Sequence, residues 1–261
     1  MKIPIYQIDV FASDVFHGNP AAVCPLEEWL DDSVMQAIAQ ENNLSETAFF
    51  VKEGEEYRIR WFTPVAEVDL CGHATLASGF VIFDYLDHTI NEVTFRSRSG
   101  LLRVGNEEEL LFMDFPSQPP CSCSPPRELL DGLGGDPMEA LCSEDYFVVF
   151  NSEGEVRGLL PNIEMLRRLD LRGVIVTAPG EDVDFVSRFF APKFGVDEDP
   201  VTGSAHCALI PYWSRRLGKH DLHAHQVSRR GGELFCADHG DRVRIAGRAV
   251  RYMEGSIALD L

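Results

Sequence analysis

The chain has 261 residues, 45% of them hydrophobic and 25% charged, a composition typical of a globular protein and a length sufficient for two domains. A net charge of −19, from 42 acidic and 23 basic residues, argues against nucleic acid and anionic membranes as partners, because a negative surface repels both. No apolar run approaches the roughly 20 residues of a membrane span and no signal-peptide pattern begins the chain, so we expect a cytoplasmic protein.

The first part of the chain predicts several strands and one ordinary helix. Apolar alternation indicates strands at residues 3–11, 21–24, 48–50 and 57–62. Helical spacing after the capping cluster Asp31-Asp32-Ser33 predicts a helix over residues 34–41. A hairpin and a further strand follow, at residues 90–96, 101–104 and 109–115.

A Pro- and Ser-rich segment at residues 117–126 breaks this periodicity and is the best candidate linker. We therefore predict an N-terminal lobe over residues 1–115, with a C-terminal strand at 255–261 as a candidate addition to it, and a C-terminal lobe over 116–254. Within the second lobe, helices are predicted at residues 127–133 and 162–168. Strands are predicted at residues 144–150, 155–160, 173–177, 185–190, 241–245, 248–253 and 256–261.

Two similar helix starts stand out from this pattern. Residues 69–75 (DLCGHAT) and 199–206 (DPVTGSAH) each combine small and polar residues where a strand-like run gives way to helical spacing. The first N–H groups of a helix have no partner inside it and lie at the positive end of the helix dipole, which favours an anion. Both starts are therefore candidate sites for a small anionic substrate.

The sequence before each helix start is also repeated. RWFTP at residues 60–64 corresponds to RFFAP at 188–192, and a Val-Asp pair follows each proline at the same distance, at 68–69 and 196–197. The second copy is longer by three residues, which this alignment places around Glu198-Asp199-Pro200. We interpret the repeat as a duplication that gives two similar α+β lobes, each a sheet around one strong helix, with chance similarity as the alternative.

Glu46 and His73 are the first candidates for chemistry. Glu46 stands just before an apolar run, where partial desolvation suits a carboxyl group to proton transfer; a capping or strand-edge glutamate is the alternative. His73 lies in the first helical turn, where the positive dipole end favours neutral imidazole, although a purely structural histidine is also compatible with the pattern.

Three residues at the helix starts have weaker local signals. Asp199 precedes the second helix, where capping is the default role. Ser204 matches His73 in the repeat but lacks the G-x-S-x-G context of a nucleophilic serine. Cys71 suggests a racemase with two thiols, but its counterpart is Thr202, which argues against that mechanism.

A group of histidines near the C-terminus could bind zinc. His223 and His225 would share one face of a strand, with His220, Cys236 and His239 nearby. The spacing matches no common zinc site and no supporting carboxylate is evident, so a solvated surface strand is favoured and no metal is predicted.

Taken together, several ordered segments resemble the phenazine-biosynthesis PhzF-like isomerase family. They are FHGNPAAV at residues 16–23, NLSETAF at 43–49, RWFTP at 60–64, EVDLCGHAT at 67–75 and EDPVTGSA at 198–205. The resemblance implies the two-lobed fold of diaminopimelate epimerase, in which each lobe is a barrel or curved sheet around a central helix and the active site lies between the lobes. It also implies a cofactor-independent isomerase that moves a proton between carbons of a small carboxylated metabolite.

The resemblance further implies a role for each matching residue. Glu46 would transfer the proton, and His73, Asp199 and Ser204 would assist it. Substrate binding would fall to Asn19, Gly72, Ala74, Thr202 and Gly203, with backbone N–H groups of the two glycines holding substrate oxygens. The family also suggests a homodimer, while the substrate and direction of reaction stay open. The alternative from a different class is a non-catalytic protein that binds a small anion in the same cleft.

Overall fold

The computed structural model describes residues 1–259 and divides the chain into two compact units. The first unit comprises residues 1–113 together with the chain from Ala246 onward, and the second comprises residues 114–245. The chain returns to the first unit at Ala246 instead of residue 255, because a single strand, β18 (Ala249–Ala258), pairs along its length with β1 (Lys2–Val10). The predicted strands at 248–253 and 256–261 are thus one strand, and residues 260–261 lie outside the described range.

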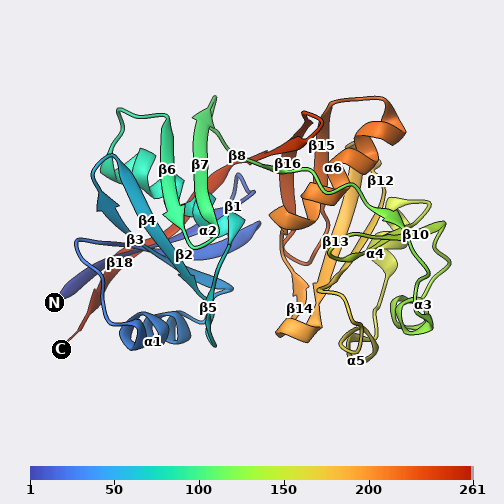
Figure 1. Ribbon diagram of the computed structural model, residues 1–261, viewed down its shortest axis with the longest axis horizontal. Helices are drawn as coiled ribbons and strands as arrows, with labels where there is room; N and C mark the ends of the chain where they lie inside the picture. The colour runs from blue at the N-terminus through green and yellow to red at the C-terminus, as the bar shows by residue number, and fades with distance from the viewer. Residues whose placement is uncertain (260–261) are drawn as a thin grey trace. The chain divides into compact units, whose positions relative to one another are not determined.

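The first unit is a mixed, mainly antiparallel β structure (Figure 1). Besides β1 and β18, its elements are β2 (Asn19–Leu26), α1 (Asp32–Asn42), β3 (Glu46–Glu53), β4 (Glu56–Phe62), β5 (Glu67–Val68), α2 (Gly72–Val81), the π-helical η1 (Ile82–Leu86), β6 (Glu92–Ser97), β7 (Gly100–Glu107) and β8 (Leu110–Pro116). β1 pairs antiparallel with β2, β2 pairs parallel with β3, and β3 pairs antiparallel with β4. β8 leads into the second unit.

Helix α2 is the central helix of the first unit and packs against β1, β2, β3 and β7. It is buried on nearly all sides, including the polar residues His73, Thr75 and Ser78. The hydroxyl groups of Thr75 and Ser78 donate to the carbonyl oxygens of Cys71 and Ala74, at 2.6 and 2.8 Å. These bonds within the helix satisfy the buried hydroxyls and let small polar residues occupy the core.

The second unit repeats the scheme of strands around one long helix. Its remaining elements are β9 (Cys121–Ser122), α3 (Arg127–Leu133), β10 (Glu139–Cys142), β11 (Tyr146–Val149), α4 (Glu153–Gly158), α5 (Ile163–Leu166), β12 (Val174–Pro179), β13 (Phe185–Ala191), the 3-10 turn η2 (Pro192–Phe194), β14 (Val196–Asp199), α6 (Gly203–Leu217), β15 (Asp221–Gln226), β16 (Gly232–Asp238) and β17 (Arg242–Gly247). In α6, Trp213 stacks on Phe185 at 5.8 Å between ring centroids and donates its indole N–H to Thr177 Oγ1 at 2.9 Å. An aromatic anchor with its polar atom satisfied fixes this helix against the sheet.

The duplication is visible in matching side-chain contacts. Arg60 Nε and Nη2 bind the two carboxylate oxygens of Glu67 at 2.7 and 2.9 Å, and Arg188 binds Glu198 in the same way at 2.7 and 3.1 Å. At both helix starts a side chain also binds the carbonyl oxygen of the residue four positions earlier. Thr75 binds that of Cys71 in the first unit, and His206 binds that of Thr202 in the second. The same bidentate ion pair and an equivalent helix-start contact in both units support the interpretation of the repeat as a duplication.

These contacts correct the predicted position of the extra residues. Glu67 precedes Gly72 by the same interval as Glu198 precedes Gly203 (72 − 67 = 203 − 198), so no residue is inserted between them. The additional length falls between Pro192 and Glu198 and includes the turn η2. Alignment on the two Val-Asp dipeptides is wrong because the Arg–Glu pairing, and not the dipeptide, sets the true register.

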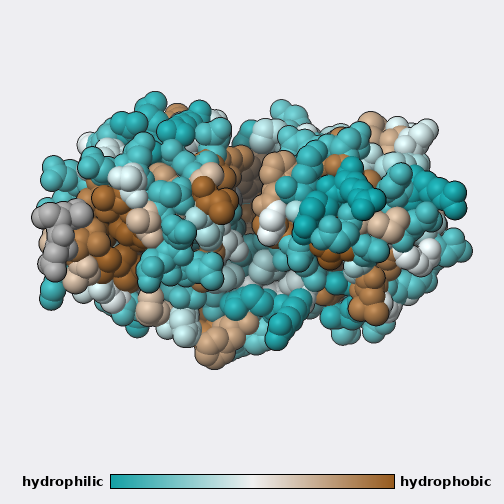
Figure 2. All heavy atoms as spheres, turned by 90° about the horizontal axis from the view of Figure 1, so that it is seen from below, coloured by the Kyte–Doolittle hydropathy of each residue, from teal (hydrophilic) through white to brown (hydrophobic). Residues whose placement is uncertain are grey.

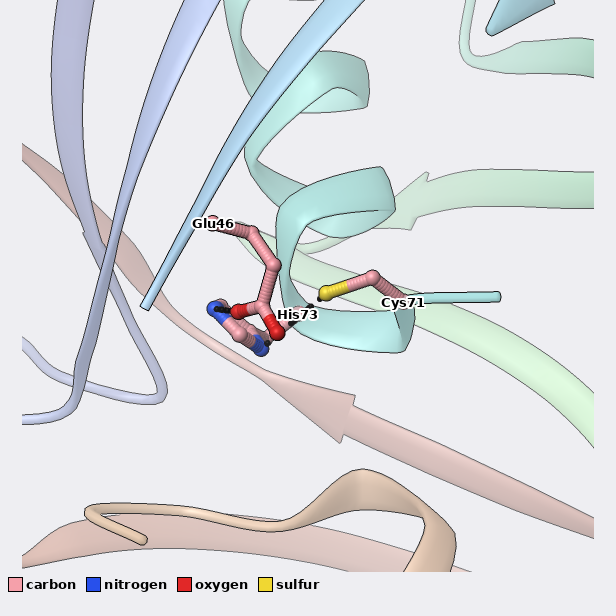
Figure 3. Close-up of side chains that lie close together, drawn as sticks. All are labelled: Glu46, Cys71 and His73. Atoms are coloured by element: carbon pink, nitrogen blue, oxygen red, sulfur yellow. Dashed lines mark hydrogen bonds and ion pairs between the residues drawn. The ribbon is translucent and has the colours of Figure 1, made fainter. Parts of the chain in front are cut away.

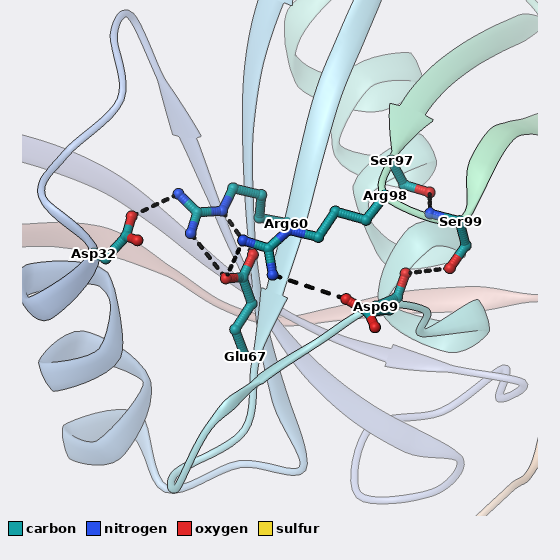
Figure 4. Close-up of polar contacts among 7 residues, drawn as sticks. All are labelled: Asp32, Arg60, Glu67, Asp69, Ser97, Arg98 and Ser99. Carbon is teal, nitrogen blue, oxygen red and sulfur yellow. Dashed lines mark hydrogen bonds and ion pairs between the residues drawn. The ribbon is translucent and has the colours of Figure 1, made fainter.

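In the first unit the ion pair of Arg60 with Glu67 belongs to a larger network of polar contacts that fixes the segment before α2 (Figure 4). Arg60 also binds Asp32 at 2.8 Å, and Arg98 reaches Glu67 at 2.9 Å. Ser99 Oγ donates to the carbonyl of Asp69 at 2.8 Å. The chain entering α2 is thereby held from α1, β4 and the β6–β7 turn.

Two further expectations fail for local reasons. Residues 155–158 belong to helix α4 instead of a strand, and residues 159–160 follow its end. Ser152 caps the helix by accepting a bond from Glu155 N at 3.2 Å, a Ser-x-x-Glu start that the apolar pattern obscured. The Pro- and Ser-rich segment at 117–126 belongs to the second unit and is not a linker. Its β9 pairs with β10, and Gln118 N donates to Cys207 O at 2.9 Å.

Within residues 1–259, no helix has both the length and the apolar character needed to cross a bilayer. Figure 2 shows one face of the chain, on which hydrophilic side chains predominate and apolar side chains form smaller groups.

Candidate active site

The predicted residues of the first unit meet where β3 begins beside the start of α2 (Figure 3). Glu46 is the first residue of β3, and its Oε2 lies 3.3 Å from His73 Nε2, with side chains 19% and 9% exposed. Because β2 runs parallel to β3 with Ala21 opposite Glu46, the fully buried Asn19 lies at the same end of the two strands. We call Asn19, Glu46, Cys71 and His73 the Glu46 cluster.

His73 is neutral in this setting. Burial lowers the pKa of His73 to about 4, partly opposed by the backbone of Pro20, so the ring carries no charge near pH 7. The neutral state agrees with the expectation from the helix position, and burial is the cause that lowers the pKa. The Glu46 carboxyl group therefore faces an uncharged imidazole, which can take part in hydrogen bonds but supplies no positive charge to pair with a carboxylate.

Cys71 is the third ionisable side chain of the cluster. Its Sγ lies 3.5 Å from His73 Nδ1 and the residue is buried. Carboxyl, imidazole and thiol thus form one compact group, although the repeat offers no second thiol to match Cys71. Their three ligand atoms lie within 4.8 Å of one another, so these groups could also hold a metal ion.

The start of α2 supplies backbone donors next to these side chains. Its N-cap residue, Cys71, makes no side-chain capping bond, and Gly72 is half-buried and has no side chain of its own. Ala74 as a whole, backbone included, is completely buried, so the structure does not expose it to a substrate. An uncapped, partly accessible helix start is suited to binding a carboxylate oxygen.

In the second unit the predicted residues lie on the segment that enters α6. The Thr202 hydroxyl donates to Asp199 Oδ2, and Thr202 makes no side-chain capping bond. Gly203 is half-buried and Ser204 is exposed in the first turn of the helix. This helix start therefore offers a carboxylate, a hydroxyl and backbone N–H groups on one short segment.

Gln226 is a positioning residue that the sequence does not reveal. Its buried side chain accepts from Thr202 N at 2.8 Å and donates to Asp199 O at 2.9 Å and Thr202 Oγ1 at 3.2 Å. Gln226 is the last residue of β15, which pairs in parallel with β13. Since no local pattern links residue 226 to residues 199–202, only the sheet topology identifies it.

The second helix also contains a buried histidine. His206 Nδ1 lies 2.8 Å from Thr202 O, so this nitrogen carries the hydrogen of the neutral ring. Burial lowers the pKa of His206 to about 4, with the Thr202 carbonyl opposing the shift.

We expect acidification to destabilise the chain through this histidine. An unfolded histidine has a pKa of about 6.5, so the unfolded state binds more protons than the folded state between pH 6.5 and 4. The contribution of His206 to stability is therefore complete above pH 6.5 and is lost as the pH falls toward 4, by about 2 kcal/mol on going from pH 7.5 to 5. Urea unfolding at these two pH values measures the change.

His206→Asn, whose amide can still donate to Thr202 O, should lose less stability between the two pH values than the wild type. His220→Asn, at an exposed histidine of the same unit, should keep the wild-type pH dependence. An unchanged pH dependence in His206→Asn would contradict the assignment.

Comparison with known proteins gives a consistent assignment. The family model described as phenazine biosynthesis-like protein (PhzC-PhzF) matches residues 8–255. An uncharacterized isomerase of Pseudomonas aeruginosa is 55% identical over 99% of this chain and 100% of its own length. The crystal structure of a PhzF-family protein from Enterococcus faecalis superposes with a TM-score of 0.97 at 50% identity, covering 99% of this chain and 100% of that one.

The fold extends to more distant enzymes. A probable proline racemase from Agrobacterium radiobacter shares the fold with a TM-score of 0.64 at 11% identity, over 99% of this chain and 93% of that one. The predicted α+β, epimerase-like fold is thus confirmed. From its sequence and its structure alike, the chain belongs to the phenazine biosynthesis-like (PhzC-PhzF) protein family.

Proposed function

We propose that the chain is a cofactor-independent isomerase that moves a proton between two carbons of a small carboxylated metabolite, with Glu46 as the acid–base group. Membership of the PhzC-PhzF family and relatives named as isomerases support an isomerase role. The observation that carries the mechanism is the half-buried Glu46 carboxyl group, 3.3 Å from a neutral, buried imidazole at the uncapped start of α2.

The reaction needs no external oxidant or reductant. The Glu46 carboxylate takes a proton from one substrate carbon and, as the carboxylic acid, returns it to another. A carbon–carbon double bond of the substrate changes position, and the carboxylate of Glu46 is regenerated. Negative charge that develops on the substrate carboxyl group during this step is stabilised by backbone N–H groups at a helix start. Positioned acid–base catalysis of this kind contributes about 10²–10⁴-fold in rate.

The remaining predicted residues have supporting roles in this mechanism. His73 holds a substrate oxygen or the Glu46 carboxyl group in position, and Gly72 contributes its N–H. We infer that Asp199 and Ser204 take part in the same reaction, because the start of α6 repeats the start of α2 and has the carboxylate of Asp199 at the position of Val68. Asn19, Thr202 and Gly203 are proposed to contact the substrate, and the fully buried Ala74 to support the helix start behind them.

Hydrogen exchange tests this function even when the product is not identified. Small carboxylated candidates are incubated with the protein in D₂O, and deuterium incorporation is followed by NMR and mass spectrometry. We expect enzyme-dependent exchange at a carbon next to a carboxyl group or its conjugated double bond. A candidate that binds tightly by calorimetry but shows neither exchange nor conversion would favour a non-catalytic anion-binding protein instead.

A further inference from the structure

A second cluster of ionisable side chains lies in the second unit, on strands β15 and β16. It consists of His223, His225 and Glu233, whose ligand atoms all lie within 4.8 Å of one another. None of them belongs to the Glu46 cluster or to the segment that enters α6. From this arrangement we propose that the chain binds one divalent transition-metal ion of the Zn²⁺ class through His223, His225 and Glu233.

Strand geometry puts the three ligands on one face. His223 and His225 alternate with Leu222, Ala224 and Gln226, which are buried on the opposite face. In the antiparallel register of β15 and β16, His225 lies directly opposite Glu233 and His223 opposite Phe235. The side chains of paired residues on one face are close enough to bind the same metal ion.

The side chains are already oriented toward one another. His223 Nε2 lies 2.8 Å from Glu233 Oε1, and the two imidazole rings are 5.3 Å apart between centroids. The His223 ring stacks on Phe235 at 4.9 Å with an interplanar angle of 4°, which limits its rotation. Tetrahedral zinc with bonds of about 2.0–2.2 Å places its ligand atoms roughly 3.3 Å apart, a spacing that atoms already within 4.8 Å of one another reach by small side-chain movements.

The surrounding charges are mixed but favour a cation. Glu153 acts on His225 from α4, but its two oxygens already accept from Arg157 and from Glu181 N. Arg157 opposes a bound cation, whereas Glu233 and the net charge of −19 attract one. Asp184, which accepts from His223 N, is paired with Lys219.

The structure also changes the ligand set suggested by the histidine spacing. Cys236 is buried and lies opposite Leu222, so its thiol belongs to the other face of the sheet. His220 and His239 are exposed beyond the ends of β15 and β16. Two imidazoles and a carboxylate remain, a borderline set that suits Zn²⁺ and leaves a fourth position open to water, since the side chains of His223 and Glu233 are 37% and 34% exposed.

Metal titration tests the assignment directly. Protein prepared without a histidine tag is stripped with a chelator and titrated with Zn²⁺ against a chromophoric competitor. We expect one equivalent per chain, and an affinity weakened about tenfold or more in His225→Gln and in Glu233→Gln. His220→Gln and His239→Gln are the matched controls and should bind like the wild type, whereas equal binding in all four variants, or none in the wild type, would overturn the proposal.

Cobalt distinguishes this site from the Glu46 cluster. Co²⁺ bound by His223, His225 and Glu233 should show visible bands of a four- or five-coordinate ion without a sulfur-to-cobalt charge-transfer band. A charge-transfer band that disappears in Cys71→Ser would place the metal at the Glu46 cluster and overturn the proposal. Circular dichroism and urea unfolding of the metal-free variants show whether each is folded, and a Zn²⁺-dependent rise in the Tm of the wild type, absent in Glu233→Gln, supports the site independently.

Discussion

Glu46→Gln is expected to lower kcat/KM for proton transfer by about 10²–10⁴-fold while leaving the protein folded. The carboxamide has nearly the size of the carboxyl group and can still lie beside His73, but it cannot accept a proton from carbon. The substitution changes only the side chain, so we expect the backbone pairing of Glu46 with Ala21 of β2 to be retained. Deuterium exchange into a substrate identified in D₂O measures the loss.

Glu41→Gln is the matched control, since Glu41 is an exposed glutamate on α1 of the same unit. It should retain wild-type exchange. If Glu46→Gln exchanged deuterium as fast as the wild type, Glu46 would not be the base, although family membership and the fold would stand. A substrate that binds both proteins equally would further separate loss of chemistry from loss of binding.

Gly18→Ala should destabilise the chain by about 3–5 kcal/mol, the largest stability effect that we expect from a single methyl group. Gly18 has φ +65°, and a Cβ there would lie 2.1 Å from the carbonyl oxygen of Val10. Relief of this clash requires the turn between β1 and β2 to move, and Asn19 is the next residue. Urea unfolding measures the loss of stability, and we expect reduced catalysis in any protein that remains folded.

Gly54→Ala separates backbone strain from the steric clash. Gly54 has a similar φ of +68°, but a Cβ there would meet no heavy atom within 4 Å. Its substitution should therefore cost only about 1 kcal/mol, the penalty of a left-handed conformation for alanine. Equal losses at the two positions would show that the contact with Val10 is not what requires glycine at residue 18.

The Glu46 cluster is predictable in part because its members carry local signals. Glu46 stands between a polar turn and an apolar run, and His73 stands at a helix start, so each can be selected from its neighbours in sequence. Their contact depends on the parallel pairing of β2 with β3 and on the burial of α2 between strands. The repeat alone argues against a role for Cys71, yet its thiol lies against the same imidazole.

The predicted fold is likewise right where the signal is local and clear, and wrong where a local pattern is misleading. Helix α3 (Arg127–Leu133) has the ends that the sequence predicts, whereas α4 replaces a predicted strand because a short apolar alternation conceals a capped helix start. The extra residues of the second repeat are misplaced by the sequence because matching dipeptides carry less information than the Arg188–Glu198 ion pair.

By itself, the sequence determined the α+β class, the two central helices, the duplication and the identity of Glu46 and His73 as candidates, because these depend on periodicity and on residues adjacent in the chain. Only the tertiary structure decided which strands pair and in what register. That register brings Gln226 to the segment that enters α6, Glu67 to Arg60, and Glu233 to His223 and His225. Such contacts join residues far apart in sequence, and no short pattern specifies them because they depend on how whole strands align.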